Sequence, residues 1–85
     1  MEVRKVKTET QELLTRPEHP YDSMVVVSVT GKATIALDEP LGSGTITPCR
    51  GMQLSCRDGR TTWLTGKGEI EVWLVLAGET VFIPA

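Results

Sequence analysis

The fold is decided by two short stretches, Met24-Val25-Val26-Val27-Ser28-Val29 and Ile70-Glu71-Val72-Trp73-Leu74-Val75-Leu76. Each is predicted to be a β-strand. A strand at the surface of a small domain alternates apolar and polar residues, because only one of its faces is buried. These two stretches are apolar on both faces. We therefore expect the second face to be covered by something outside the domain, such as another copy or a larger assembly.

The size and charge of the chain limit what it can be. Its 85 residues make one domain, and a domain of this size is marginally stable unless disulfides, metals or oligomerisation add to its stability. The formal net charge of −2 favours neither nucleic acid nor an anionic membrane surface as a partner. No apolar run approaches the ~20 residues that span a bilayer. The charged start, Met1 to Lys7, lacks the apolar stretch of a signal peptide, which predicts synthesis in the cytoplasm.

Turn signals divide the chain from residue 24 onward into short strands. Gly31-Lys32, Asp58-Gly59 and Gly78-Glu79 each have the length and composition of a two-residue hairpin loop. The stretch Thr45 to Thr47, ended by Pro48, is expected to be a short edge strand. About six to seven strands at this spacing indicate an all-β fold, a small antiparallel β-sandwich or barrel.

The first 23 residues differ from the rest of the chain. They are rich in charge and threonine, and Pro17 and Pro20 break any helix that begins near Thr8. Few apolar side chains are available to anchor them. We therefore predict an N-terminal arm over residues 1–23 and a sandwich or barrel domain over residues 24–85.

Two-residue loops fix which residues lie opposite each other, and so which side chains share a face. Around Gly78-Glu79, this register places Val75 opposite Phe82 and Trp73 opposite Pro84, on the face away from the core. Exposed apolar patches often mark contact sites, and tryptophan is enriched at binding hot spots. We predict that this patch contacts a partner protein. The alternative is that the arm folds back over it.

The same reasoning assigns faces around the other two turns. Around Asp58-Gly59, Leu54 lies opposite Trp63 on a face expected to be buried, whereas Leu64 lies on the solvated face. In the strand before Gly31, one face is predicted to carry three valines: Val25, Val27 and Val29. Such a strand belongs in the middle of a sandwich or at a subunit boundary.

Residues that carry chemistry are sparse. Cys49 and Cys56 are expected to be two buried thiols, although a disulfide between them or a metal site stays open as an alternative. The single histidine, His19, lies in the arm and is expected to be exposed or to pack. The chain has no GxSxG, HExxH or phosphate-binding glycine loop. We therefore expect no catalytic residue, no metal and no cofactor.

One charged feature stands apart from the rest. Arg57 and Arg60 are expected to face each other across Asp58-Gly59, with Arg50 nearby in sequence. Like charges directly opposite are unfavourable. This tip is therefore predicted to project into solvent or to dock against an acidic surface.

Two resemblances follow from the strand layout. The segment Pro48 to Leu54, with Trp63-Leu64 and then Leu76 to Pro84, resembles small β-sandwich proteins of tailed-bacteriophage particles. Those proteins have a Cys-Arg-x-apolar-x-apolar strand and a late Leu-x-x-Gly-Glu-x-apolar-x-Ile hairpin. The resemblance covers residues 30–84 and implies a structural role in the virion, such as capsid decoration or a head or tail accessory subunit.

The stretch Gly59 to Pro84 also resembles the second half of a cupin barrel, with Gly-Glu-Thr-Val-Phe-Ile-Pro as its final strands. It is similar, too, to a small bacterial domain with a Gly-Arg-x-x-Trp-Leu-Thr … Gly-Glu pattern. Cupin enzymes hold a metal with clustered histidines and a glutamate. This chain has no histidine after residue 19, so only the strand layout carries over.

These features together predict a non-enzymatic structural protein that forms homo-oligomers or joins the protein subunits of a capsid or tail, and that resides in the virion after synthesis in the host cytoplasm. The predicted contact residues are Trp73, Val75 and Phe82 of the patch, Val3, Val6, Leu13 and Leu14 of the arm, and Arg50, Arg57 and Arg60 of the tip. Two cytoplasmic alternatives stay open. One is a cupin-like module that binds a small molecule, and the other is a regulatory adaptor that docks through the arginine tip.

Overall fold

Eight strands make up the regular structure in the computed structural model, which describes residues 1–16, 21–39, 42–56 and 61–82. The strands are β1 (Glu2–Thr8), β2 (Gln11–Thr15), β3 (Ser23–Gly31), β4 (Thr34–Glu39), β5 (Gly42–Ile46), β6 (Gln53–Ser55), β7 (Thr61–Thr65) and β8 (Gly68–Val75). These residues contain no helix, and the strands form two antiparallel four-stranded sheets packed face to face. The prediction of an all-β sandwich or barrel is confirmed as a sandwich, with eight strands in these residues where about six to seven were expected.

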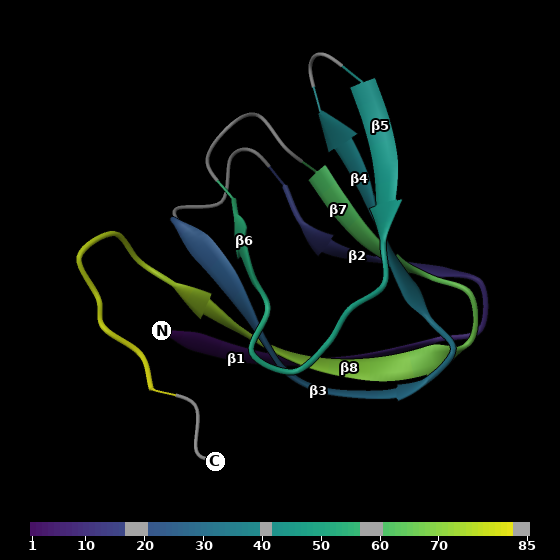
Figure 1. Cartoon of the computed structure of the whole chain (residues 1–85), viewed down its shortest axis with the longest axis horizontal. Coiled ribbons are helices and arrows are strands. Elements are labelled where there is room, and N and C mark those ends of the chain that lie inside the picture. Colours follow the sequence, from purple (N-terminus) through teal and green to yellow (C-terminus); the bar gives the residue numbers. More distant parts are fainter. Residues whose placement is uncertain (17–20, 40–41, 57–60, 83–85) are drawn as a thin grey trace.

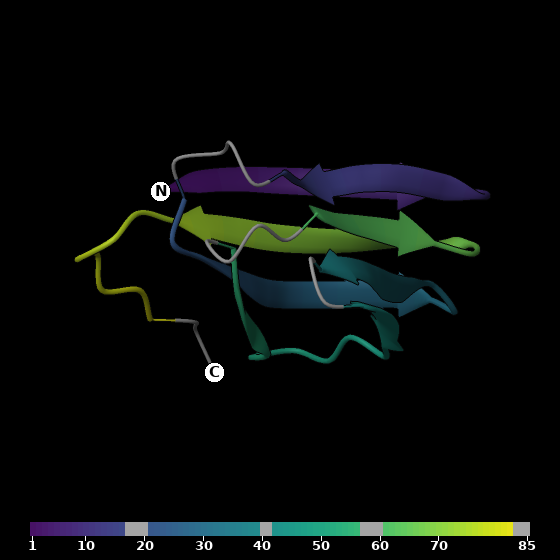
Figure 2. The ribbon, with the colours of Figure 1, turned by 90° about the horizontal axis from the view of Figure 1, so that it is seen from above.

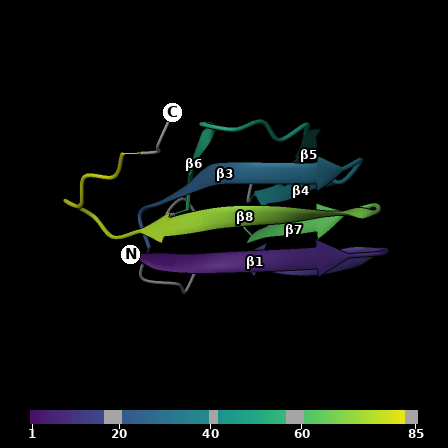
Figure 3. The same ribbon diagram turned by 90° about the horizontal axis from the view of Figure 1, so that it is seen from below.

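The two sheets have matching strand orders. Sheet A runs β1-β8-β3-β6, and sheet B runs β2-β7-β4-β5 (Figures 1 and 3). Each strand of sheet A is therefore joined through the chain to the strand at the same place in sheet B. Figure 2 shows this pairing from above, with β2 beside β1 and β7 beside β8. Eight strands that are connected in this way and divided between two packed sheets form a jelly roll.

Three of these connections turn together at one end of the sandwich, where β1 passes to β2, β3 to β4 and β7 to β8 (Figure 1). Backbone hydrogen bonds tie the turns to each other. The N–H of Gly66 donates to the carbonyl of Thr10 (2.9 Å), and the N–H of Lys32 donates to the carbonyl of Lys67 (3.0 Å). Gly31 adopts a positive φ of 80°, and a Cβ there would come within 2.8 Å of the backbone of Gly68. The turns therefore pack too closely for a side chain at residue 31.

The core lies between the sheets and consists almost entirely of aliphatic side chains. Its buried members are Leu14, Met24, Val26, Ala33, Ile35, Cys56, Leu64, Ile70, Val72 and Leu74. They come from both sheets and alternate along β7 and β8 with residues that face outward. Burial of such side chains contributes about 1.5–3 kcal/mol each.

The prediction that Gly31-Lys32 and Asp58-Gly59 each join two paired strands of one hairpin is wrong. The strands before and after Gly31-Lys32 belong to different sheets, and so do β6 and β7. Residues 57–60, which include Asp58-Gly59, lie outside the described residues. The faces change accordingly: Leu64 is fully buried, whereas Trp63 faces outward beside Leu13 and Ala36.

Residues 2–15 are part of the sandwich and not an arm. β1 pairs with β8 along its whole length, and β2 pairs with β7. Leu14 is completely buried in the core, and Val6 packs against the core. The segment has few apolar residues because both strands lie at sheet edges, where one long border is solvated. No helix begins near Thr8; this segment forms the strand β2 instead.

The C-terminal hairpin predicted around Gly78-Glu79 is a turn without a second strand in the described residues. The N–H of Glu79 donates to the carbonyl of Leu76 (3.1 Å), and Gly78 has a positive φ of 86°, which suits the third position of a type II turn. β8 already pairs with β1 on one side and β3 on the other, so neither of its edges is free for the segment that follows. Pro84, expected opposite Trp73, lies outside the described residues.

A β-bulge changes the predicted face of β3. The pairing of β3 with β8 shifts register between Val26 and Ser28, which inserts Val27 as an extra residue. Val25 consequently pairs with Trp73 on the outer face, while Val29 packs against the core. The three valines expected on one face are therefore divided between the two.

Candidate protein-binding surface

An apolar row crosses the outer face of sheet A. Val3 of β1 lies in register with Trp73 of β8, and Trp73 lies in register with Val25 of β3. Val75 lies two residues beyond Trp73 and points the same way, because side chains alternate along a strand. These four residues, Val3, Val25, Trp73 and Val75, form what we call the outer patch.

Charged pairs continue the outer face beside the patch. Lys5 lies in register with Glu71, and its ammonium is 3.8 Å from the Glu71 carboxylate. The indole N–H of Trp73 donates to the same carboxylate at 3.4 Å. The next register pair is Lys7 with Glu69. The outer patch therefore has an apolar centre and a charged border, which is the usual arrangement of a protein interface.

The C-terminal tail, residues 76–82, covers one end of the patch. Val25 and Val75 are only 8% and 5% exposed although they lie on the outer face. Both line a cleft of about 260 Å³ whose other wall includes Glu79, Thr80 and Val81. The tail curls below sheet A at the end of β8 (Figures 1 and 3). The cover comes from the C-terminal side of the chain, and the alternative of an N-terminal arm over the patch is wrong.

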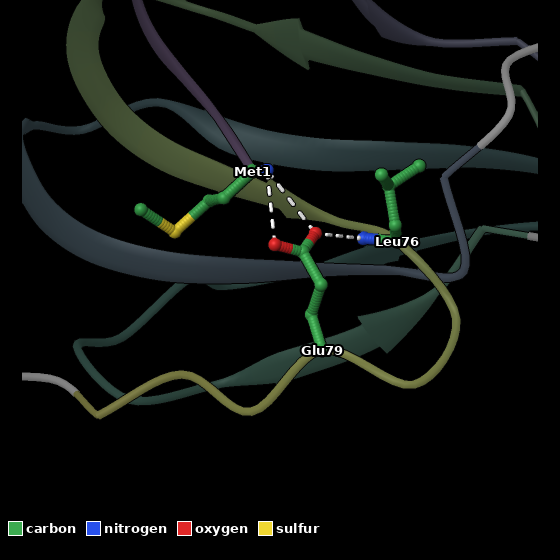
Figure 4. A network of polar contacts seen from close by, with 3 residues as sticks. All are labelled: Met1, Leu76 and Glu79. Atoms are coloured by element: carbon green, nitrogen blue, oxygen red, sulfur yellow. Dashed lines mark hydrogen bonds and ion pairs between the residues drawn. The ribbon is translucent and has the colours of Figure 1, made fainter.

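A polar network fixes the start of the tail to the start of β1 (Figure 4). The carboxylate of Glu79 accepts a hydrogen bond of 2.7 Å from the N–H of Leu76 and forms an ion pair with the α-amino group of Met1 at 3.1 Å. The hydrogen bond from Leu76, followed by that from the α-amino group, lowers the pKa of Glu79 below its ordinary value. The ionised carboxylate thus joins Met1 to the turn that follows β8.

Large apolar side chains remain exposed at this end of the molecule. Val3 is 51% exposed and Phe82 is 84% exposed; Met1 and Leu76 are exposed as well. Met1 and Leu76 both contact Glu79 (Figure 4). Exposed apolar residues are normal when scattered singly, whereas several on one part of a surface make that part a candidate for contact with another molecule.

The structure distributes the predicted contact residues unevenly. Val3, Trp73 and Phe82 are accessible or half-buried, and Val3 and Trp73 share the outer patch. Leu14 and Val6 face the core, and Val75 is almost fully covered. Leu13 lies half-buried on the opposite outer face, beside Trp63 in sheet B. Val6, Leu13 and Leu14 do not form one surface with Trp73, because β1 and β2 are integral strands with fixed inward and outward faces.

The arginine tip is described only in part. Arg50 is exposed in the turn before β6. Arg57 and Arg60 lie outside the described residues, as does His19.

Sequence reasoning missed two features of the outer patch. Val25 joins the outer patch only through its pairing with Trp73, and the tail covers it only because β8 has no free edge; neither relationship has a local sequence signal.

The free edge of β1 is protected against pairing with another strand. Strand edges expose unpaired N–H and C=O groups, and charged side chains on an edge strand discourage pairing. β1 carries three cations, Arg4, Lys5 and Lys7, and two copies paired through this edge would bring them together. A partner is therefore better accommodated on the outer face than along this edge.

The described residues contain no cluster of side chains suited to holding a metal. No group of three His, Cys, Asp or Glu residues that could hold a metal occurs in the described ranges. Neither Cys49 nor Cys56 forms a disulfide; Cys56 is buried as predicted, whereas Cys49 is exposed, contrary to the prediction. Within the same residues there is no helix long and apolar enough to cross a membrane.

Comparisons with protein-family models, with curated proteins and with solved structures find no match to this chain. The strand order is shared by viral capsid proteins, lectins and cupins, so the fold does not choose among functions. Inference about function therefore depends on the surface of the molecule.

Proposed function

We propose that this chain is a non-enzymatic assembly subunit that associates with further copies of itself through the outer patch. The observation that supports this most directly is the row of Val3, Trp73 and Val25 on a face directed away from the core. Half of Val3 is exposed to solvent. A half-buried tryptophan at the centre of such a row, with charged pairs beside it, has the composition of a binding hot spot.

The free energy expected from covering the outer patch is that of a weak contact, which becomes effective when many copies of the chain assemble. At about 25 cal/mol per Å² of apolar area, covering Trp73, Val3 and the neighbouring tail side chains contributes a few kcal/mol. Association costs offset much of this gain for a single pair of subunits. In a particle with many copies, several such contacts act at once, and the effective affinity rises by orders of magnitude.

The particle that we propose is a virion of a tailed bacteriophage. The support is the resemblance of residues 30–84 to small β-sandwich proteins of such particles. In this setting the outer patch contacts neighbouring subunits of a head or tail. The chain is then expected to sediment with purified particles in a density gradient and to be depleted from the soluble fraction of the host lysate.

Sedimentation equilibrium over about 1 μM to 1 mM protein tests self-association, because weak protein contacts have dissociation constants in this range. We expect the average mass of the wild-type chain to rise with concentration. Trp73→Glu places a charge in the patch and should remain monomeric with an unchanged far-UV circular dichroism spectrum. Thr45→Glu, which adds the same charge at an exposed position on the opposite outer face, is the control and should associate like the wild type.

Two results would contradict this proposal. One is a wild-type chain that stays monomeric at the highest concentration. The other is a Trp73→Glu variant that associates as strongly as the Thr45→Glu control, which would place the interface elsewhere on the molecule.

A further inference from the structure

The outer face of sheet B carries an open groove of about 480 Å³, on the side of the sandwich away from the outer patch. Trp63 lines this groove from β7, one of the two central strands of the sheet. Polar side chains from four different strands line it as well: Gln11 of β2, Asp38 of β4, Thr45 of β5 and Thr65 of β7. A volume of this size lies within the range of small-ligand sites.

The neighbours of Trp63 leave room beside its ring. In register with Trp63 are Leu13 on one side and Ala36 on the other. Ala36 in turn pairs with Thr45, so two short side chains lie between the tryptophan and the edge of the sheet. The indole is half-buried, and it combines an apolar ring face with one N–H donor. The groove thus offers an aromatic surface with hydrogen-bonding groups around it.

The charge of the groove narrows the class of ligand. Asp38 is the one ionisable residue among the described residues that line it, and it is exposed. Within the described lining this carboxylate has no cation beside it, which disfavours phosphates, nucleotides and other anions. It accepts hydrogen bonds from hydroxyl groups, and the amide of Gln11 and the hydroxyl of Thr45 both donate and accept. The matching ligand is neutral, has one apolar face and carries hydroxyls around its rim.

We propose that this groove binds a neutral pyranose sugar, with one face of the ring on the indole of Trp63 and its hydroxyls on Asp38 and Gln11. The C–H bonds on one face of a pyranose give it the apolar surface, and its equatorial hydroxyls extend outward in the ring plane. An open groove of this kind holds a single ring with a dissociation constant on the order of 1 mM. This proposal is independent of self-association, because the outer patch lies on the other sheet.

Titration of the ¹⁵N-labelled chain by NMR tests the site, and the two tryptophans provide an internal control. The probes are methyl α-D-glucopyranoside, methyl β-D-galactopyranoside and methyl α-D-mannopyranoside, each to about 50 mM, well above the expected dissociation constant. We expect at least one probe to shift the indole N–H signal of Trp63 in a saturable manner and to leave that of Trp73 unchanged. Trp63→Phe assigns the two signals. No saturable shift with any of the three probes overturns the proposal.

Variants then separate the sugar site from the rest of the molecule. Trp63→Ala is expected to abolish binding, and Trp73→Ala is expected to retain the wild-type affinity. Asp38→Asn keeps the size of an exposed side chain, so it preserves the fold, and it should weaken binding by about 10-fold, the loss of one charge-assisted hydrogen bond. Wild-type affinity in Asp38→Asn, or a Trp63 shift on adding inorganic phosphate that strengthens in that variant, overturns the assignment of a neutral sugar.

Discussion

The guanidinium of Arg4 donates a hydrogen bond of 2.6 Å to the carbonyl oxygen of Leu14, and so joins the edge strand of sheet A to the edge strand of sheet B. Leu14 lies where the pairing of β2 with β7 shifts register, between Leu13 and Thr15. A bulge leaves backbone groups outside the ladder of the sheet. Arg4 therefore closes the open side of the sandwich by binding a carbonyl in the irregular part of β2.

Replacing Arg4 should measure the contribution of this contact. Arg4→Met keeps an unbranched chain that can pack over the core but removes the donor, and we expect a loss of about 1–2 kcal/mol in the free energy of unfolding. Lys5→Met, on the solvated face of the same strand, should cost less than about 0.5 kcal/mol, because it removes only an exposed ion pair. Urea unfolding of both variants provides the comparison, and equal losses would contradict the assigned role.

A buried pair of hydroxyl groups links β2 to β7 within sheet B. The Oγ1 atoms of Thr15 and Thr62 are 2.6 Å apart, and both residues are almost completely buried. Thr15→Val or Thr62→Val alone should destabilise the fold by about 1–3 kcal/mol, because each leaves the other hydroxyl without a partner. The double variant should recover most of this loss. Additive losses in the double-mutant cycle would show that the two hydroxyls do not depend on each other.

The close packing of the turns predicts opposite effects for two glycine substitutions. Gly31→Ala forces a Cβ into a positive-φ position within 2.8 Å of the Gly68 backbone, and we expect a loss of about 2–4 kcal/mol in the free energy of unfolding. Gly44→Ala in β5 meets no atom within 4 Å and has no positive φ, so it should be neutral or stabilise slightly. Thermal unfolding of the two variants distinguishes these outcomes, and similar melting temperatures would refute the packing argument.

The attachment of the tail should depend on pH. Glu79 has a lowered pKa in the folded chain, so its contacts are fully formed above the pKa of the unfolded chain and are lost as the pH falls through the lowered value. The amide signal of Leu76 should titrate in NMR with a midpoint below that of Glu79 in the urea-unfolded chain. Glu79→Gln should remove this titration. A midpoint equal to that of the unfolded chain would mean that the contact with Leu76 does not form in solution.

The sequence predicted where several strands lie better than it predicted how they pair. The short edge strand expected at Thr45 to Thr47 is found in part: β5 lies at the edge of sheet B, but it begins at Gly42 and ends at Ile46. The turn at Gly31-Lys32 has the composition of a hairpin loop, yet it connects two sheets. Whether such a turn joins two strands of one sheet or connects the two sheets depends on which aliphatic residues are buried between the sheets. That burial involves residues distant in sequence.

For side-chain directions too, the sequence predicted what depends on neighbouring residues better than what depends on pairing between distant ones. The outward direction of Trp73 follows from alternation along β8 and was predicted. The inward direction of Leu14 was not, because a short, charged segment gives little sign that a bulge directs one leucine into the core. Trp63 was assigned to the wrong face, since its register was counted from a hairpin that does not exist. A shift of one residue in register exchanges the two faces of a strand.

The insertion of β8 between β1 and β3 has a consequence for synthesis on the ribosome. Sheet A lacks the strand that joins β1 to β3 until residue 75 has left the exit tunnel, so the valine-rich β3 emerges long before its main partner, β8. During that interval its backbone is available to other nascent chains, and its valines favour strand pairing. Sheet A can therefore be completed only after β8 has emerged, and residues 24–29 stay available for intermolecular pairing until then.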